Sequence, residues 1–249
     1  MNNTISLRCA THNLCHFGKS PFDRDELFPD HSYRNGYEPE MLPVMKERWK
    51  AVYDSFDADL IGLQEYCPFF DLAHTIPVPE QVFLPYGLSV YADDFVNAAG
   101  HRLAAASKTP LLKAYERSFM PVSERRYQKF FMEIRGRRIA VFNTHPMPKG
   151  TPEAIATRQA EYRILLKEFR KEKTFIAFGD FNARTAEEFG VFLDAGLKMA
   201  NTGTGTEEHG LTCDNIIVSP DFTIQKTALS DSAFSLSDHA VLRAELLLA

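Results

Sequence analysis

The stretch that decides the fold reads TFIAFGDFNART and runs from Thr174 to Thr185. Five mostly apolar residues lead into Gly179, Asp180 and Asn182, so a buried strand is expected to end there. Gly and Asp are ordinary turn residues, and in a plain turn the carboxylate and the amide would bond their own backbone. A carboxylate and an amide at the end of a buried strand also suit an active site, where a rigid element holds polar groups toward a ligand. The segment alone leaves both interpretations open.

The same pattern recurs along the chain, where other apolar segments also end in, or begin with, polar residues. Taken singly, each of these positions is more often structural than functional. Six such segments in one chain favour a shared cluster, provided that the strands are neighbours. The positions are His12 and Asn13, Gln64 and Glu65, Asn143 to His145, Asp180 and Asn182, Asp214, and Ser237 to His239.

The residue types in this set point to a specific chemistry. Carboxylate and amide oxygens suit a hard cation such as Mg²⁺ or Mn²⁺. Such a cation and the imidazoles would hold a phosphoryl group, and one Asp or His could activate water. The sequence therefore favours hydrolysis of a phosphate ester.

The periodicity of the chain predicts an α/β protein. Apolar stripes indicate helices from Pro43 to about Phe56 and from Pro152 onward, the latter capped by Thr151. A capping box at Thr185 predicts a third helix that ends at Gly196. Many short strands surround these helices, and the sequence RGRR marks a hairpin with Gly136 at its tip. This combination favours mixed sheets covered by helices.

No linker or repeat divides the chain, so residues 1–249 are expected to form one domain. A polar and aromatic insertion at about residues 16–40 shows no clean period and is interpreted as a lid over the site. Its aromatic side chains could stack on a base, cover a small ligand or simply pack onto the domain.

Composition narrows the classes of protein further. Of 249 residues, 45% are hydrophobic and 24% are charged, which is typical of globular proteins. The formal net charge of −5 argues against a protein that wraps duplex nucleic acid by bulk charge. The sequence shows no signal-peptide pattern and no apolar run near the roughly 18 residues of a membrane span, so a cytoplasmic monomer is expected. The four cysteines lack the spacing of a zinc site.

Several segments together carry a family likeness. In chain order they are THNL, LIGLQEY, AAASKTPLL, VFNTHPMP, ATRQAEY, FGDFNA, CDNIIVS and LSDHAVLRAEL. The chain resembles the endonuclease/exonuclease/phosphatase superfamily of DNase I-like phosphoesterases over nearly its whole length. The resemblance implies an α/β four-layer sandwich of two mixed β-sheets flanked by helices. It also implies a Mg²⁺- or Mn²⁺-dependent enzyme that attacks phosphate esters directly with water.

The resemblance assigns the metal site by position. Glu65 would be the principal metal ligand. Asn13 would lie beside it and bind the metal directly or through water. Asp238 would add a carboxylate near the same site.

The remaining roles also follow from the resemblance. Asp180 would position or deprotonate the attacking water, and Asn182 would donate to a phosphate oxygen. His239 would contact the phosphate, while Asp214 would fix its tautomer through a hydrogen bond. His145 is the candidate acid for the leaving oxygen or a second phosphate contact. The spacing leaves the assignment of acid and base open.

The substrate is a phosphate ester of unassigned kind. A phosphodiester in nucleic acid is favoured, because residues 108–138 hold nine Lys or Arg against three Glu and could bind a nucleic-acid backbone. A solvated hairpin face explains the same residues. The alternatives are a phosphatase or phosphodiesterase for a small phosphate ester or phospholipid head group, similar to inositol phosphatases or sphingomyelinases, and a non-catalytic binding module on the same fold.

Overall fold

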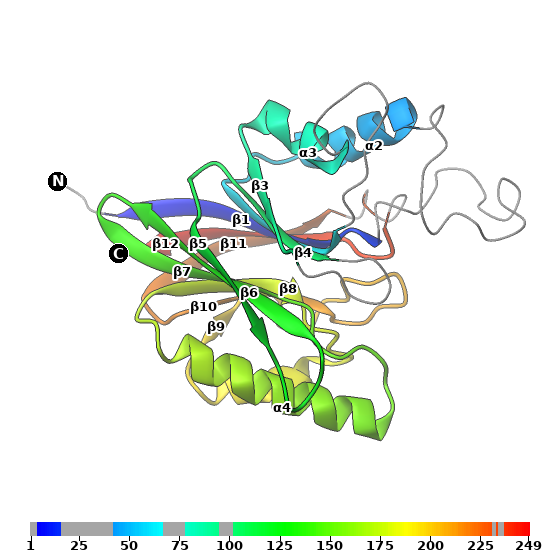
Figure 1. Cartoon of the computed structure of the whole chain (residues 1–249), viewed down its shortest axis with the longest axis vertical. Helices are drawn as coiled ribbons and strands as arrows, with labels where there is room; N and C mark the ends of the chain where they lie inside the picture. The colour runs from blue at the N-terminus through cyan, green and yellow to red at the C-terminus, as the bar shows by residue number, and fades with distance from the viewer. Residues whose placement is uncertain (1–3, 16–41, 67–77, 95–101, 231–232, 234–236) are drawn as a thin grey trace, which may run out of the picture.

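The chain folds into two facing β-sheets with helices on their outer sides (Figure 1). The computed structural model describes residues 4–15, 42–66, 78–94, 102–230, 233 and 237–249. Sheet A has the strand order β11 (Phe222–Ser230), β12 (Val241–Leu248), β1 (Ile5–Asn13), β2 (Leu60–Tyr66), β4 (Arg102–Ser107) and β3 (Ser89–Ala92). Sheet B has the order β5 (Leu112–Ser118), β6 (Arg126–Ile134), β7 (Arg137–Thr144), β8 (Phe175–Asp180), β10 (Asp214–Val218) and β9 (Lys198–Met199).

Both sheets are mixed. β1 pairs in parallel with β2, and β7 pairs in parallel with β8. The other pairings are antiparallel, including that of β1 with β12 and that of β8 with β10. Helices join the strands of each parallel pair, because the chain must return to the same end of the sheet before the second strand begins.

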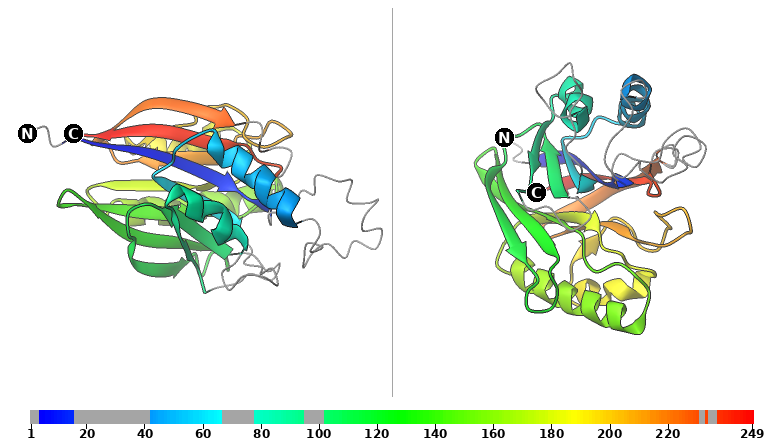
Figure 2. Two further views of the ribbon diagram at one scale, coloured as in Figure 1. Left: turned by 90° about the horizontal axis from the view of Figure 1, so that it is seen from above. Right: turned by 45° about the vertical axis from the view of Figure 1, so that its right-hand side comes forward.

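The helices complete a four-layer sandwich. α2 (Leu42–Asp54), α3 (Val78–Phe83) and the 3₁₀ turn η3 (Leu84–Tyr86) lie on the outer side of sheet A. α4 (Pro152–Phe169), the 3₁₀ turn η4 (Ala186–Phe189) and α5 (Gly190–Leu193) lie against sheet B. Figure 2 shows the two sheets from above and from the side, between these helical layers. The predicted fold class is confirmed.

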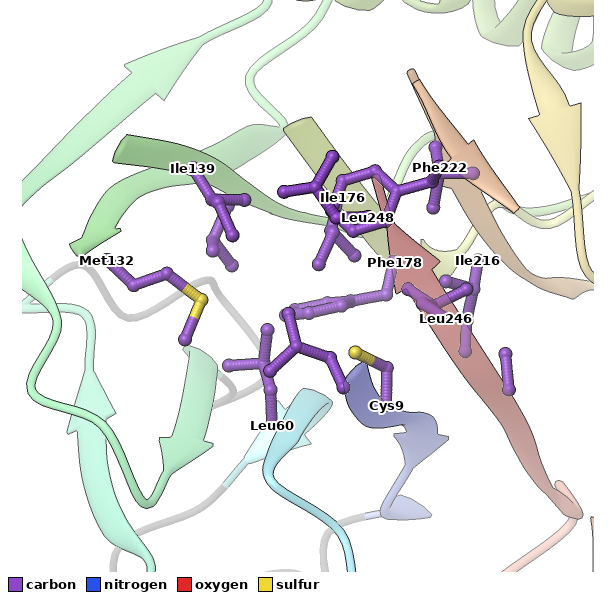
Figure 3. Packing of buried hydrophobic residues seen from close by; sticks show 14 of the residues in the cluster. Cys9, Leu60, Met132, Ile139, Ile176, Phe178, Ile216, Phe222, Leu246 and Leu248 are labelled. Atoms are coloured by element: carbon purple, nitrogen blue, oxygen red, sulfur yellow. The ribbon is translucent and has the colours of Figure 1, made fainter. Parts of the chain in front are cut away.

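Each interface between layers has its own apolar core. Between the sheets, Phe178 of β8 packs among residues such as Cys9, Leu60 and Leu246 from sheet A (Figure 3). Beneath α2 and α3 lies a second cluster that includes Trp49, Tyr53, Ile61 and Phe83. Beneath α4 lies a third, in which Tyr162, Leu165 and Phe169 meet Phe142 of β7. The alternation of buried and exposed positions early in β1 reflects a strand with one covered face.

Two glycines lie where backbones approach closely. A Cβ on Gly62 of β2 would overlap the ring of Phe178 from the opposite sheet. A Cβ on Gly179 would overlap the carbonyl oxygen of Thr144 on the neighbouring strand β7. Close packing of β8 against β7 therefore requires glycine at position 179, whatever turn follows the strand.

Two turn predictions are confirmed in detail. Thr151 caps α4, because its hydroxyl accepts a hydrogen bond from the backbone N–H of Ala154, and Pro152 occupies the first turn. Gly136 lies at the tip between β6 and β7, where Arg135 and Gly136 both have positive φ, at 51° and 72°. This backbone matches the right-handed twist of the paired strands.

The helix predicted between Thr185 and Gly196 is wrong in detail. The segment forms the 3₁₀ turn η4 followed by the four-residue α5, and the Thr185 side chain makes no capping bond. The carboxylate of Glu188 bonds the Arg184 N–H and the buried Arg158 guanidinium instead of closing a capping box. The predicted lid at residues 16–40 lies outside the described residues. Among the residues that are described, no helix has the length and apolarity to cross a membrane.

Candidate active site

The strand directions bring the polar strand ends to one edge of the sandwich. β1 and β2 run in parallel, so Asn13 and Gln64 lie side by side at their carboxyl ends. β7 and β8 do the same in sheet B, where Thr144 pairs with Gly179. β10 runs against β8, so its first residue, Asp214, pairs with Asp180. Segments far apart in sequence therefore meet at this edge.

Asp180 lies at the centre of this edge and contacts residues from both sheets. Its Oδ2 accepts a hydrogen bond from Asn13 Nδ2 at 2.9 Å and lies 3.4 Å from His145 Nε2. The same oxygen lies 3.7 Å from His239 Nε2. Its Oδ1 accepts from the backbone N–H of Asn182 at 2.7 Å. The carboxylate is only 2% exposed, so these contacts define its surroundings.

His239 is held from behind by Asp214. The Nδ1 atom of His239 lies 2.7 Å from Asp214 Oδ2, and both side chains are buried. This contact leaves the Nε2 atom of His239 directed toward Asp180. A carboxylate that bonds one ring nitrogen of a histidine usually fixes the orientation of the ring in this way. The other oxygen of Asp214, Oδ1, is buried without a hydrogen-bond partner among the described residues.

Glu65 and Asp238 place two further carboxylates around the imidazoles. Glu65 Oε1 lies 3.9 Å from His145 Nε2, and Asp238 Oδ1 lies 4.0 Å from His239 Nε2. The structure thus brings all eight predicted site residues into one connected set. Their chemical roles remain predictions.

Two residues of the set have an uncommon backbone conformation. Glu65 has φ of 50° and Asn182 has φ of 55°, both in the left-handed region. Asn adopts this region readily, whereas Glu does so at a cost. Glu65 also lies where the pairing of β2 with β4 shifts register, between Leu63 and Tyr66. Such strain clusters at functional sites, so the bulge that turns Glu65 is itself an indication of a site.

Electrostatics fix the charge states of the two central groups. Burial works to raise the pKa of Asp180, but the attraction of His239 and His145 and the Asn13 hydrogen bond outweigh it, so this pKa lies well below its usual range. Burial works to lower the pKa of His239, but attraction to Asp214 and Asp180 raises it well above its usual value. The edge therefore presents a carboxylate beside a protonated imidazole at neutral pH.

Comparison with known proteins identifies the family. The model of the Endonuclease/Exonuclease/phosphatase family matches residues 44–239. The chain belongs to this family. Members of the endonuclease/exonuclease/phosphatase family are hydrolases that act on phosphate esters.

Solved structures of the endonuclease/exonuclease/phosphatase fold superimpose on most of the chain. ANGEL2, described as a 2′,3′-cyclic phosphatase in complex with adenosine-2′,3′-vanadate, is 14% identical and has a TM-score of 0.72, covering 99% of this chain and 97% of that one. TDP2 from Caenorhabditis elegans is 19% identical with a TM-score of 0.69, over 98% and 75% of the two chains. A family member from Beutenbergia cavernae is 14% identical with a TM-score of 0.69, over 98% and 72%. None of the curated proteins compared with the chain matches it. The similarity shows the DNase I-like fold.

The sequence selected Gln64 and Asn143 as polar strand ends without assigning them roles, and the structure shows that they form a buried polar layer beneath the candidate site. Gln64 Nε2 donates to Asn143 Oδ1 at 2.7 Å, and Thr11 Oγ1 donates to Gln64 Oε1 at 3.3 Å. Asn143 Nδ2 reaches the Leu63 carbonyl and Gln128 Oε1. These bonds tie sheet A to sheet B. In the sequence, this layer is indicated by two amide residues: Gln64, which precedes Glu65, and Asn143, which precedes Thr144.

Ser237, which the sequence selected as a polar strand end without assigning it a role, also links segments at the site. Its hydroxyl donates to the Asn13 carbonyl at 2.7 Å and accepts from the His239 N–H at 3.0 Å. It therefore links the end of β1 to the start of the His239 segment. His12, by contrast, faces away toward helix α2: its Nδ1 lies 2.9 Å from the Tyr53 hydroxyl, and burial lowers its pKa to about 3.

The basic residues of segment 108–138 do not all face solvent. Lys129 is 7% exposed and pairs with Glu172, and Lys108 pairs with Asp57. Arg125 does reach the site, where its Nη1 donates to the His145 carbonyl at 3.3 Å. A nucleic-acid surface here would therefore be smaller than the sequence count suggests.

A cavity of about 260 Å³ lies elsewhere, beside β1, β11 and β12. Its lining includes Arg8, Phe56 and Arg243. None of the eight predicted site residues lines it. The cluster at the strand ends thus remains the candidate active site, on the strength of its chemistry.

Proposed function

We propose that this protein is a divalent-metal-dependent phosphoesterase that cleaves a phosphodiester by direct attack of water. The observation that carries the proposal is the position of the Asp180 carboxylate, within 4 Å of both His145 and His239. An ionised carboxylate between two imidazoles can orient and deprotonate water while the imidazoles contact the phosphate. No covalent enzyme intermediate is required.

The donor atoms at this edge fit a hard cation. Carboxylates of Glu65 and Asp238, with the amide of Asn13, offer oxygen ligands of the kind that Mg²⁺ and Mn²⁺ prefer. A second possible set is Asp180, Asp214 and His239, each of which offers one ligand atom within 4.8 Å of the other two. We favour the first set, because the Glu65 and Asp238 side chains are 21% and 37% exposed and can be reached from solvent, whereas Asp214 is fully buried. A bound divalent ion would supply positive charge that polarises the phosphoryl group.

The protein's own residues would share the remaining work. Asp180 stays ionised because its pKa is held low, so it would position or deprotonate the attacking water. His239, protonated and fixed by Asp214, would stabilise the negative charge that develops on the phosphate oxygens. Asn182 would donate to a phosphate oxygen, although its Nδ2 also bonds the Pro146 carbonyl at 3.1 Å. His145 would donate a proton to the leaving oxygen or contact a second phosphate oxygen.

A nucleic-acid phosphodiester is the favoured substrate. The support is Arg125, a basic residue of the segment 108–138 whose Nη1 donates to the His145 carbonyl and which could contact a nucleic-acid backbone. The neighbour ANGEL2, whose printed description is that of a 2′,3′-cyclic phosphatase, is consistent with a nucleotide phosphate in this fold.

A substrate panel tests the proposal. Plasmid DNA, single-stranded DNA, RNA, nucleotides, inositol phosphates and sphingomyelin would each be incubated with the protein in Mg²⁺, in Mn²⁺ and in EDTA. We expect cleavage of at least one nucleic-acid substrate that EDTA abolishes and added metal restores. Turnover of a small ester or phospholipid alone would support the alternative substrate class, and metal binding without turnover would support a binding module.

Asp180→Ala is the decisive variant in that panel. Removing the water-activating carboxylate should lower the rate on the order of 10²-fold or more, measured as kcat. Asp194→Ala is the matched control, because Asp194 is an exposed carboxylate at the end of α5. Undiminished activity in Asp180→Ala, with folding verified by circular dichroism, would rule out the proposed role.

A further inference from the structure

Side chains of the helix α4 hold the segment that carries His145. Residues 145–150 join β7 to α4 and form neither helix nor strand. Arg158 Nη1 donates to the carbonyls of Met147 at 3.0 Å and Lys149 at 2.9 Å. Glu161 Oε2 accepts from the Met147 N–H at 2.7 Å. Two residues of α4 thus bind three backbone groups of this segment.

Arg158 and Glu161 are unusual residues for the buried face of a helix. Both are 0% exposed, whereas Arg and Glu are rarely buried fully unless they are paired. Arg158 has its partner in Glu188, which it contacts through Nε at 3.0 Å and Nη2 at 2.6 Å. Glu161 also accepts from the Ser123 hydroxyl. All the charged groups are satisfied, so this is a complete network.

Stability alone does not account for such a network. Desolvation of buried charges largely cancels their attraction, and apolar residues of similar volume often serve a core as well or better. α4 already has an apolar stripe of Tyr162, Leu165 and Phe169 to anchor it on sheet B. A role other than stability is therefore needed to explain the two buried charges. The groups that they bind indicate this role, because those groups belong to the backbone that follows His145.

We propose that Arg158 and Glu161 are positioning residues, which fix the backbone after His145 so that its imidazole stays beside Asp180 and Glu65. The inference rests on the proposed function, because it assigns His145 a part in hydrolysis. α4 is a rigid platform, and residues three apart on a helix share one face. A displacement of about 1 Å at a reacting group can cost about 10²-fold in rate.

Hydrogen exchange tests the positional part without any substrate. In Glu161→Ala the Met147 amide loses its acceptor, so its protection against exchange should fall about tenfold or more. Arg158→Met should raise exchange at the Met147, Lys149 and Gly150 amides. Glu161→Gln keeps an acceptor of the same shape and should retain much of the protection. Exchange in the β6–β7 hairpin should not change in any of these variants.

A double-mutant cycle tests the catalytic part. If Glu161 acts through His145, Glu161→Ala should lower kcat by about 10²-fold with little change in KM, and should cost nothing further in a His145→Ala background. Multiplicative losses in the double variant would overturn the proposal. Arg163→Met is the matched control, because Arg163 is exposed on the same helix and should leave kcat unchanged.

The two tests separate the possible failures. Unchanged exchange at Met147 in Glu161→Ala and Glu161→Gln would overturn the inference whatever the enzyme does. If Glu161→Ala fails to fold, Glu161→Gln and Arg158→Lys carry both measurements, and each should show a partial effect in the same direction. If wild-type protein hydrolyses no phosphate ester, the proposed function fails and the catalytic part of the inference fails with it.

Discussion

Asp180 shows how far a single residue's position at the end of a strand can predict that it belongs to a functional site. The sequence places a carboxylate directly after a buried strand, and this position suffices to select it as a site residue. Its contacts with Asn13 and His145 depend on strand pairing, which the residues themselves do not specify. The sequence selected Ser237 and Gln64 without assigning them roles, and did not select Arg158, for a related reason. Polar side chains that bind buried backbone or other amides leave no hydropathy signal of their own.

The His239–Asp214 pair yields a prediction at this scale. Asp214→Asn keeps the shape of the side chain but removes its negative charge, so the imidazole at 239 loses both its orientation and part of its proton affinity. We expect kcat to fall by about 10²- to 10⁴-fold.

The pH profile of the same variant has a definite direction. The pKa of His239 is raised in the wild type, partly by Asp214, so protonated His239 persists above the usual titration range of histidine. Without that attraction the pKa falls, and the alkaline limb of the rate profile should move to lower pH. Rates measured from pH 5 to 10 test this, and an unmoved alkaline limb would contradict the assigned role of His239.

At the scale of helices and strands, length decides what can be predicted. Both bounds of α2 and the start of α4 were predicted close to the observed ones, because an apolar stripe extends over many residues. α5 has four residues and β9 has two, which is too short for any period to show. The wrong helix after Thr185 has a tertiary cause, since Arg158 takes the Glu188 carboxylate that a capping box would use.

The cap of α4 supports a prediction at this scale. Thr151→Ala removes the side-chain oxygen that accepts the Ala154 N–H, so the free energy of unfolding should fall by about 1 kcal/mol. Thr157→Ala is the matched control, because Thr157 is half-buried within the same helix and its hydroxyl donates to the Glu153 carbonyl, not to an unpaired N–H of the first turn. Urea titrations of both variants measure the difference. Equal stability of the two would show that the cap contributes nothing.

For the whole molecule, the sequence predicted the layers but not the way in which they meet. Helices and strands in alternation imply sheets covered by helices. No local sequence pattern predicts which strands belong to sheet A and which to sheet B, because this assignment depends on contacts between residues far apart in sequence. The polar layer of Gln64 and Asn143 and the close approach at Gly62 both belong to this long-range level.

Gly62 gives a prediction for the packing of one sheet on the other. Gly62→Ala forces a methyl group into the ring of Phe178, so the protein should lose about 1–3 kcal/mol of unfolding free energy or more. Phe178→Leu in the same chain should recover part of the loss by making room. Gly190→Ala is the control, since a Cβ there meets nothing within 4 Å and its φ of −48° is helical. Chemical denaturation compares them, and an unaffected Gly62→Ala would mean that the sheets can move apart without penalty.

The pairing of β1 with β12 has a consequence for the order in which sheet A folds. Ile5 lies opposite Leu248, so two strands that most of the sequence separates must meet before the sheet is complete (Figure 2). β12 lies between β1 and β11, and His239 lies just before its first residue, Val241. Until β12 is in place, one edge of β1 lacks a partner strand and the candidate site lacks His239. The candidate site is therefore expected to assemble late in folding, because it depends on a contact of high sequence separation.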